Sequence, residues 1–210
     1  MNSMIEYRGL SIGTEEGVYT PADDSLLAAG LVADFLVEAG RNNLSLLDMG
    51  TGTGILGLAA CSTGRVSDAV FADANPDAVA LARRNAEKNG IDGSVRCSFL
   101  ESDLFGAVDG KFDIIAFNPP YLRSEDGGRE GPFSWWDGGS RGIDTTVEFL
   151  RGAVTHLKDG GVIFVVYSSL SDVTGLEEEI ARLGMMRSKT TKTHVFFEDI
   201  VAAALVRADV

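Results

Sequence analysis

Basic residues are scarce in this sequence. Of its 210 residues, 18 are lysine or arginine and 31 are aspartate or glutamate, which gives a formal net charge of −13 at pH 7. Phosphate backbones attract clustered basic side chains, and the sequence contains no such cluster. We therefore do not expect a nucleic acid as the primary partner, although acidity also has the simple effect of keeping a protein soluble.

Long apolar runs and metal-binding cysteine patterns are also missing. No apolar run approaches the roughly 18 residues of a membrane span. Residues 1–4 lack the basic start and following apolar stretch of a secretory signal. Cys61 and Cys97 do not have zinc-ligand spacing, so we expect both to be reduced and buried, and we expect no metal site. These features predict a cytoplasmic protein without a membrane partner.

What the sequence does contain is enough apolar material for a full core. Hydrophobic residues make up 45% of the chain, and 25 residues are glycine. A chain of 210 residues suits one domain. We expect residues 1–40 to form a lead-in and a helix, and residues 41–210 to form the catalytic core.

Strand-like and helix-like segments alternate along the chain, which is typical of βαβ units. Helices are expected at 24–39, 55–62, 76–88 and 143–157, and from a cap at Ser171 or Asp172 to about 183. Strands are expected at 44–50, 69–73, 95–100, 112–117, 161–167, 193–197 and 200–207. The pattern predicts an α/β fold with a doubly wound, mostly parallel seven-stranded sheet and an N-terminal extension.

A long connection covers residues 122–142. It is rich in glycine, serine and charge, yet it contains Phe133, Trp135 and Trp136. Loops of this length are usually functional or mobile. The alternative is a surface excursion whose aromatic side chains pack down.

A glycine-rich turn follows the first core strand. Residues 48–54 read D-M-G-T-G-T-G, and glycines let a backbone approach a ligand closely. Ligands of doubly wound sheets bind at the carboxyl ends of the strands. We therefore place Asp48, Gly50, Gly52 and Gly54 in a cofactor site. The stretch 52–57 also matches the dinucleotide pattern G-x-G-x-x-G, so the turn alone does not name the cofactor.

Two further acids follow the next strands. Asp73 stands 23 residues after Gly50, where a carboxylate can accept both hydroxyls of a ribose. Asp103 could accept from an adenine amino group, with Leu104 packing near the ring. Each acid alone is also explained as a helix cap or turn residue, but in series they predict a nucleoside site.

The deciding motif is Asn118-Pro119-Pro120-Tyr121, directly after the strand expected at 112–117. An amide nitrogen is a poor nucleophile because its lone pair is delocalised. Oxygens that accept its N–H bonds return electron density to it, and the Asn118 side chain and the Pro119 carbonyl can supply them. The prolines limit reorganisation, and Tyr121 can stack on a planar group. We expect these residues to be catalytic toward a planar amide or amine nitrogen. His156 and His194 are expected to be structural.

Together these motifs resemble the class I S-adenosylmethionine-dependent methyltransferases, which have a Rossmann-like sheet. Within them the sequence is similar to the HemK group of glutamine N5-methyltransferases, which modify the Gly-Gly-Gln loop of translation release factors. The archaeal and eukaryotic branch has a lead-in V-Y-x-P-A-E-D-T and a stretch W-x-G-G-x-x-G. Here residues 18–25 read V-Y-T-P-A-D-D-S and residues 136–142 read W-D-G-G-S-R-G.

The resemblance implies S-adenosylmethionine as the methyl donor and a release factor as the protein substrate. It adds Tyr19, Pro21, Ser25 and Asn118 to the cofactor site. Asp23 stands where the group usually has glutamate, and Ser25 where it has threonine; each keeps the functional group in a smaller side chain. The branch lacks an N-terminal recognition domain and commonly works with a small zinc-ribbon activator subunit, and we expect the same here.

Three alternatives remain at this point. An Asn-Pro-Pro-Tyr loop also serves the amino groups of adenine, cytosine and guanine, so a nucleobase methyltransferase acting on RNA or DNA is the second hypothesis. A dinucleotide-dependent oxidoreductase would use the glycine turn and Asp73 but leaves residues 118–121 unexplained. A non-catalytic scaffold would leave the whole series of motifs unexplained.

Overall fold

The computed structural model describes residues 3–123 and 137–208. Its helices are α1 (Asp23–Ala39), α2 (Ile55–Ser62), α3 (Pro76–Lys88), α4 (Asp144–His156) and α5 (Val173–Arg182). Its strands are β1 (Met4–Tyr7), β2 (Leu10–Gly13), β3 (Leu44–Met49), β4 (Val66–Asp73), β5 (Arg96–Glu101), β6 (Phe112–Phe117), β7 (Leu157–Ser168), β8 (Met185–Val195) and β9 (Glu198–Arg207).

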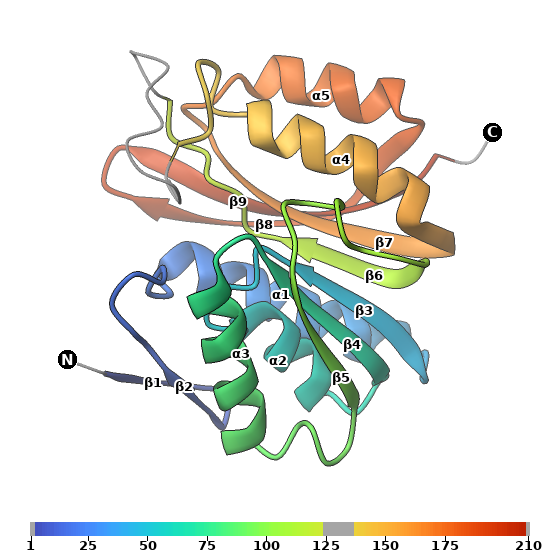
Figure 1. Ribbon diagram of the computed structural model, residues 1–210. Helices are drawn as coiled ribbons and strands as arrows, with labels where there is room; N and C mark the ends of the chain where they lie inside the picture. The colour runs from blue at the N-terminus through green and yellow to red at the C-terminus, as the bar shows by residue number, and fades with distance from the viewer. Residues whose placement is uncertain (1–2, 124–136, 209–210) are drawn as a thin grey trace.

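The main sheet has seven strands in the order β5-β4-β3-β6-β7-β9-β8. The strands from β5 to β7 are parallel, and β9 pairs antiparallel with both β7 and β8. Helices α4 and α5 lie on one side of the sheet, and α1, α2 and α3 lie on the other (Figure 1). This arrangement confirms the predicted doubly wound, mostly parallel sheet.

The two faces of the sheet contribute to two separate apolar cores. Ile114 of β6 packs into the core beneath α1 and α2, while its neighbour Ile115 packs into the core beneath α4 and α5. Phe164 and Val165 of β7 divide in the same way. Successive side chains of a strand point to opposite faces, so a strand that is covered on both faces is apolar at most of its positions. This is why the central strands appear in the sequence as continuous apolar runs.

Local capping signals start α3 and α5 where these helices were expected. The Asn75 side chain accepts from the backbone N–H of Asp77 at 3.0 Å, and Pro76 opens α3. Of the two cap candidates for α5, the structure selects Asp172, whose carboxylate accepts from the N–H of Gly175 at 3.0 Å. Both caps satisfy N–H groups that have no partner inside the helix.

One strand prediction needs correction, and one pair of strands had no prediction. The penultimate strand was expected at 193–197, but β8 extends from Met185 to Val195, and Phe196 and Phe197 belong to the turn that follows it. Because β8 is an edge strand whose residues 187–194 are all polar, it has no apolar run to reveal it. The β1–β2 hairpin was missed altogether. Its turn is made by Arg8 and Gly9, both with positive φ.

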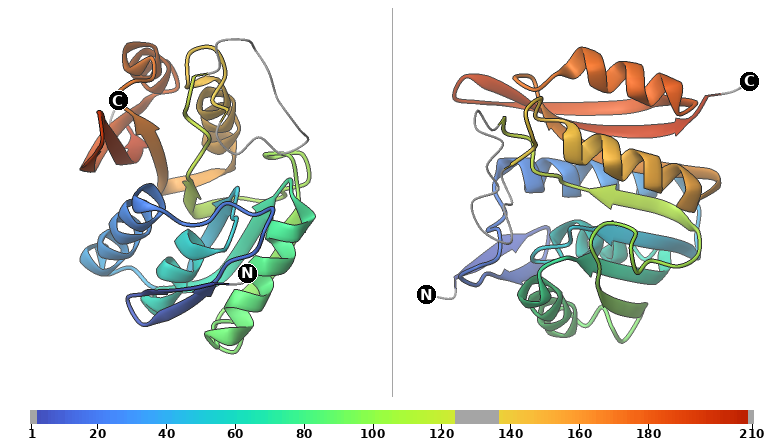
Figure 2. Two further views of the ribbon diagram at one scale, coloured as in Figure 1. Left: turned by 90° about the vertical axis from the view of Figure 1, so that its left-hand side faces the viewer. Right: turned by 45° about the horizontal axis from the view of Figure 1, so that its top comes forward.

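The β1–β2 hairpin lies beside α3 (Figure 2). The Asn85 side-chain oxygen accepts from the N–H of Gly13 at 2.8 Å, and the Asn75 amide donates to the carbonyl of Gly17 at 2.9 Å. These bonds attach the N-terminal segment to the core and bring residues 17–25 to the carboxyl edge of the parallel strands.

The predictions for the cysteines, for the aromatic residues of the long connection and for membrane spans have different outcomes. Cys61 is buried as expected, but Cys97 is partly exposed because it lies on the edge strand β5. Phe133, Trp135 and Trp136 of the long connection lie outside the described residues. Within the described part of the chain, no helix is both long enough and apolar enough to cross a membrane.

Candidate active site

A cavity of about 830 Å³ opens at the carboxyl ends of β3, β4, β5 and β6. The sheet order changes direction between β3 and β6, which is where doubly wound sheets bind their ligands. Most of the residues predicted for the site line this cavity, namely Tyr19, Pro21, Ser25, Gly50, Gly52, Asp73, Asp103, Leu104, Asn118, Pro119, Pro120 and Tyr121.

The glycine turn forms one wall of the cavity. Gly50 has a φ of 57°, and a Cβ placed on it would lie 2.5 Å from Cε2 of Phe117. A larger residue would therefore collide with the aromatic ring that lines the neighbouring wall. The turn is fixed from the side, since the Thr51 N–H donates to the carbonyl of Ala72 at 2.9 Å.

Asp48 and Gly54, predicted to contact the cofactor, do not line the cavity. Asp48 is 1% exposed and accepts from the Thr51 hydroxyl at 2.7 Å and from the Gly57 N–H at 3.0 Å. Burial raises the pKa of this carboxyl to about 7, although both hydrogen bonds oppose the rise. Gly54 is the N-cap residue of α2, with a φ of 85°. Both residues shape the turn from behind.

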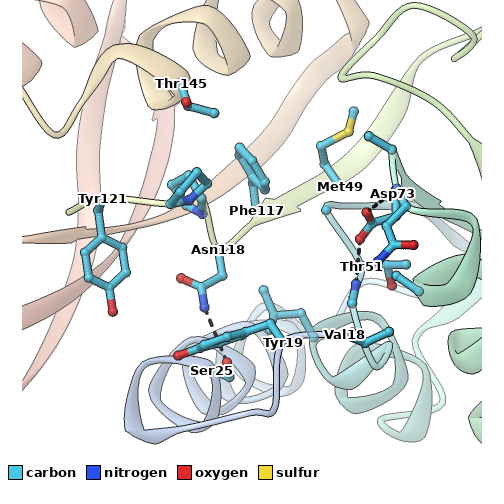
Figure 3. Close-up of a pocket in the computed structure, with 18 of the residues that line it drawn as sticks. Val18, Tyr19, Ser25, Met49, Thr51, Asp73, Phe117, Asn118, Tyr121 and Thr145 are labelled. Carbon is cyan, nitrogen blue, oxygen red and sulfur yellow. Dashed lines mark hydrogen bonds between the residues drawn. The ribbon is translucent and has the colours of Figure 1, made fainter. Parts of the chain in front are cut away.

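Asp73 lies where β4 ends and faces the glycine turn (Figure 3). One carboxylate oxygen accepts from the N–H of Gly52 at 2.9 Å, and the other accepts from the N–H of Asn75 at 2.9 Å. Burial raises the pKa of Asp73, and these backbone donors lower it in part. The carboxylate is thus held at the cavity wall, where its remaining lone pairs can accept from hydroxyl groups.

Asn118 begins the loop after β6, and its carboxamide has a defined orientation. The Nδ2 group donates to Oδ2 of Asp24 at 2.9 Å and to Oγ of Ser25 at 3.3 Å. The carboxamide oxygen points away from Ser25 (Figure 3). This oxygen is buried and accepts no hydrogen bond from any described residue. A buried acceptor without a donor is costly, so its presence marks a place for a ligand N–H.

Asp24 is a site residue that sequence reasoning missed. It is 4% exposed and lines the cavity. Besides Asn118 it accepts from the hydroxyl of Tyr121 at 3.1 Å, from that of Tyr19 at 3.2 Å, and from the backbone N–H of Ser25 at 2.6 Å. The only sequence signal for Asp24 was its place in the lead-in motif at residues 18–25. That motif did not show which groups the carboxylate binds.

The last part of the long connection, residues 137–142, packs onto the backbone of the Asn-Pro-Pro-Tyr loop. The N–H of Gly138 donates to the carbonyl of Leu122 at 2.8 Å. A Cβ on Gly138 would lie 2.8 Å from Cα of Tyr121, so a side chain here would push the loop away. The Ser171 hydroxyl donates to the Tyr121 carbonyl at 3.0 Å. The contacts of Gly138 give a structural reason for glycine at this position.

Both histidines lie outside the cavity lining. The His156 ring stacks on Phe105 with 4.6 Å between centroids, and the exposed His194 contacts Asp199 at 2.9 Å. Glu198, by contrast, reaches the cavity from the start of β9 and accepts from the Ser168 hydroxyl. No sequence motif pointed to Glu198, since the hairpin of β8 and β9 brings it to the site from far along the chain.

Comparison with known proteins decides the family. The model of the methyltransferase small domain matches residues 10–196. The chain belongs to this family. The family membership agrees with the glycine turn, the strand-end acids and the Asn-Pro-Pro-Tyr loop that meet in one cavity.

Three curated relatives of this chain are named as methyltransferases of proteins or of ribosomal RNA. A Methanocaldococcus jannaschii protein named "Putative protein N5-glutamine methyltransferase MJ0928" is 36% identical over 200 residues, which cover 94% of this chain and 96% of the relative. The release factor glutamine methyltransferase of Agrobacterium fabrum is 30% identical over 76% of this chain and 58% of its own length. The ribosomal RNA small subunit methyltransferase C of Salmonella choleraesuis is 30% identical over 85% of this chain and 48% of its own length.

Solved structures share the fold at lower identity. A ribosomal protein L11 methylase from Lactobacillus delbrueckii aligns with a TM-score of 0.67 and 19% identity, over 93% of this chain and 84% of its own. The 16S rRNA N2 G1207 methyltransferase of T. thermophilus, solved with AdoMet and guanosine, aligns with a TM-score of 0.68 and 21% identity, over 100% of this chain and 50% of its own. These likenesses support the seven-stranded, mostly parallel sheet described above.

Proposed function

We propose that this methyltransferase uses S-adenosylmethionine to methylate the side-chain amide nitrogen of a glutamine in a protein, namely the Gly-Gly-Gln loop of a translation release factor. The observation that carries the proposal is the buried Oδ1 of Asn118, which accepts no hydrogen bond from the described residues. A primary amide offers N–H donors on a flat nitrogen and fits such an acceptor.

The cavity walls fit the methyl donor. A volume of about 830 Å³ lies in the range of small-molecule sites. Gly50 and Gly52 expose backbone at one wall, Asp73 offers a carboxylate for ribose hydroxyls, and Asp103 with Leu104 suits the adenine. When bound there, S-adenosylmethionine supplies an electrophilic methyl group on a sulfonium.

The residues after β6 would prepare the acceptor nitrogen. Asn118 Oδ1 and the Pro119 carbonyl accept its N–H bonds, which holds the amide and returns electron density to the nitrogen. The proton that the nitrogen loses can leave to water. Tyr121 lies at the cavity edge, where its ring can cover the flat amide and limit the access of water (Figure 3).

A protein substrate is favoured over a nucleobase by the charge of the site. Acidic side chains line the cavity at Asp103, Asp137, Glu148 and Glu198, and the net charge of the chain is −13. Such a surface repels phosphate backbones. The relative named as an N5-glutamine methyltransferase covers 94% of this chain, which supports the same choice.

A nucleobase amino group remains the second candidate. The observation in its favour is the 30% identity to a ribosomal RNA methyltransferase over 85% of this chain. A flipped base would present a flat amino nitrogen to the same Asn118 oxygen. We further propose that the protein works in the cytoplasm, where release factors act, and that a small zinc-ribbon subunit can assist it.

The direct test is to incubate the protein with methyl-labelled S-adenosylmethionine and three acceptors, a release factor, ribosomal RNA and DNA, each with and without a zinc-ribbon subunit. We expect label on the glutamine of the Gly-Gly-Gln loop, located by mass spectrometry. A release factor with asparagine in place of that glutamine is the matched control. The Asn118→Ala enzyme should lose roughly 10²–10³-fold in kcat, the usual effect of removing one preorganised hydrogen bond. Label on RNA alone would favour the second candidate.

A further inference from the structure

We propose that Asp24 is a positioning residue whose carboxylate orients the Asn118 carboxamide so that its oxygen, not its nitrogen, faces the acceptor nitrogen. This inference rests on the proposed function, because it explains how the acceptor oxygen of Asn118 is set in place. Asp24 lies on the first turn of α1, 94 residues before Asn118, and the fold brings the two side chains together.

A carboxamide has two ends of nearly equal size and opposite hydrogen-bonding character. If nothing distinguished them, Asn118 could present either its oxygen or its NH₂ group to the cavity. An ionised carboxylate is an acceptor at both oxygens, so it attracts the NH₂ end and repels the oxygen. With Nδ2 of Asn118 only 2.9 Å from Oδ2 of Asp24, the reversed orientation would place two oxygens in contact.

The groups around Asp24 are all donors. The hydroxyls of Tyr19, Ser25 and Tyr121 and the backbone N–H of Ser25 donate to it in addition to Asn118. Burial and the nearby charge of Asp24 raise the pKa of both tyrosines, so their phenols stay protonated as donors. Because every one of these hydrogen bonds is donated to the carboxylate, Asp24 serves as the common acceptor of the network.

The Ser25 hydroxyl strengthens the same selection. It donates to Oδ1 of Asp24 at 3.2 Å, which leaves its oxygen lone pairs for the Nδ2 group of Asn118 at 3.3 Å. Both neighbours of Nδ2 are therefore acceptors. The Asp24 carboxylate also holds the hydroxyl of Tyr121 at 3.1 Å, so one buried anion fixes both ends of the Asn-Pro-Pro-Tyr loop.

An exchange of the two side chains tests this role. In Asp24→Asn, the new amide can donate to the Asn118 oxygen, which turns the Asn118 NH₂ group toward the substrate. We expect kcat to fall by about 10²-fold, as for loss of one preorganised hydrogen bond. In Asn118→Asp, two carboxylates face each other and kcat falls as well. In the double variant the amide at position 24 donates to the carboxylate at position 118, and the second oxygen of that carboxylate again faces the acceptor nitrogen.

The double variant should therefore recover at least tenfold in kcat over either single variant, measured with labelled S-adenosylmethionine and the release factor. Asp23→Asn is the matched control, because Asp23 is the adjacent, exposed acid and does not line the cavity. It should keep wild-type kcat. Affinity for S-adenosylhomocysteine, measured by calorimetry, and thermal unfolding are recorded for every variant, since a merely structural role would change these rather than kcat alone.

Three results would overturn the proposal: wild-type kcat in Asp24→Asn, no recovery in the double variant, or loss of folding in both proteins that carry Asp24→Asn. The last would assign Asp24 to stability. Failure of the proposed function has a different signature, because the wild-type enzyme itself would then leave the release factor unlabelled. If the wild type labels another acceptor, the same exchange is measured on that acceptor, and the same outcomes decide.

Discussion

Replacing Asp48 by asparagine should change how stability depends on pH. Asp48 is 1% exposed behind the glycine turn, and burial raises its pKa from 3.8 to about 7. Asparagine keeps an oxygen that can accept from Thr51 and Gly57, so the turn retains its hydrogen bonds while the buried titrating group disappears.

Proton linkage gives the sign and the size of the contribution that Asp48 makes to the free energy of unfolding. Between the unfolded value of 3.8 and the folded value of about 7, the native protein keeps a proton that the unfolded chain has lost. The contribution of Asp48 to the free energy of unfolding is therefore complete below pH 3.8 and declines as the pH rises through 7. At about 1.36 kcal/mol per pH unit, the decline sums to roughly 4 kcal/mol. The Asp48→Asn variant should gain that amount relative to the wild type across this window.

Urea unfolding at a series of pH values and constant ionic strength measures this difference. The matched control is Asp113→Asn. Burial raises the pKa of Asp113, but hydrogen bonds from Lys158 and Ser45 outweigh it and hold the pKa below its ordinary value. The pH dependence of stability then has the opposite sign. The free energy of unfolding of the wild type should exceed that of Asp113→Asn above pH 3.8, and this difference should shrink as the pH falls below 3.8, the ordinary pKa. If the difference in free energy of unfolding between wild type and Asp48→Asn stays constant from pH 4 to 8, the reasoning is refuted.

Three further outcomes are expected. Gly50→Ala should weaken S-adenosylhomocysteine binding at least about tenfold in calorimetry, because the added Cβ would lie 2.5 Å from Phe117; unchanged affinity would contradict the close approach. Asp73→Ala should raise the Kd for S-adenosylhomocysteine by about 10–100-fold, and the Kd for the analogue that lacks the 2′- and 3′-hydroxyls of the ribose far less, since it removes an acceptor for ribose hydroxyls; equal effects on the two Kd values would contradict the ribose role. Phe196→Ser with Phe197→Ser should change the free energy of unfolding by less than about 0.5 kcal/mol, because these side chains are 88% and 92% exposed; a larger loss in thermal unfolding would show that they pack.

The sequence was informative wherever one local signal determines the structure. Asn75 and Pro76 placed the start of α3, and the apolar run at 161–167 placed β7, because these signals act within a few residues. The order of strand-end motifs also brought Gly50, Asp73, Asp103 and Asn118 to one cavity, since parallel strands end at one edge of a sheet.

The remainder depends on contacts between distant parts of the chain. Asp24 meets Asn118 and Tyr121 across 94 and 97 residues, and nothing in the local sequence specifies this meeting. Glu198 reaches the cavity through an edge hairpin, and the unbroken polar run at 187–194 hid the length of β8. Asp48 was expected beside the cofactor, yet the structure turns it behind the loop, where it accepts from Gly57.

The most direct test of the account is the structure of the complex with S-adenosylhomocysteine and a peptide that contains Gly-Gly-Gln. We expect the glutamine side-chain nitrogen at a hydrogen-bonding distance of about 3 Å from Oδ1 of Asn118, with the cofactor along the Gly50 turn. A glutamine held elsewhere, or an Asn118 carboxamide with its nitrogen toward the peptide, would contradict it.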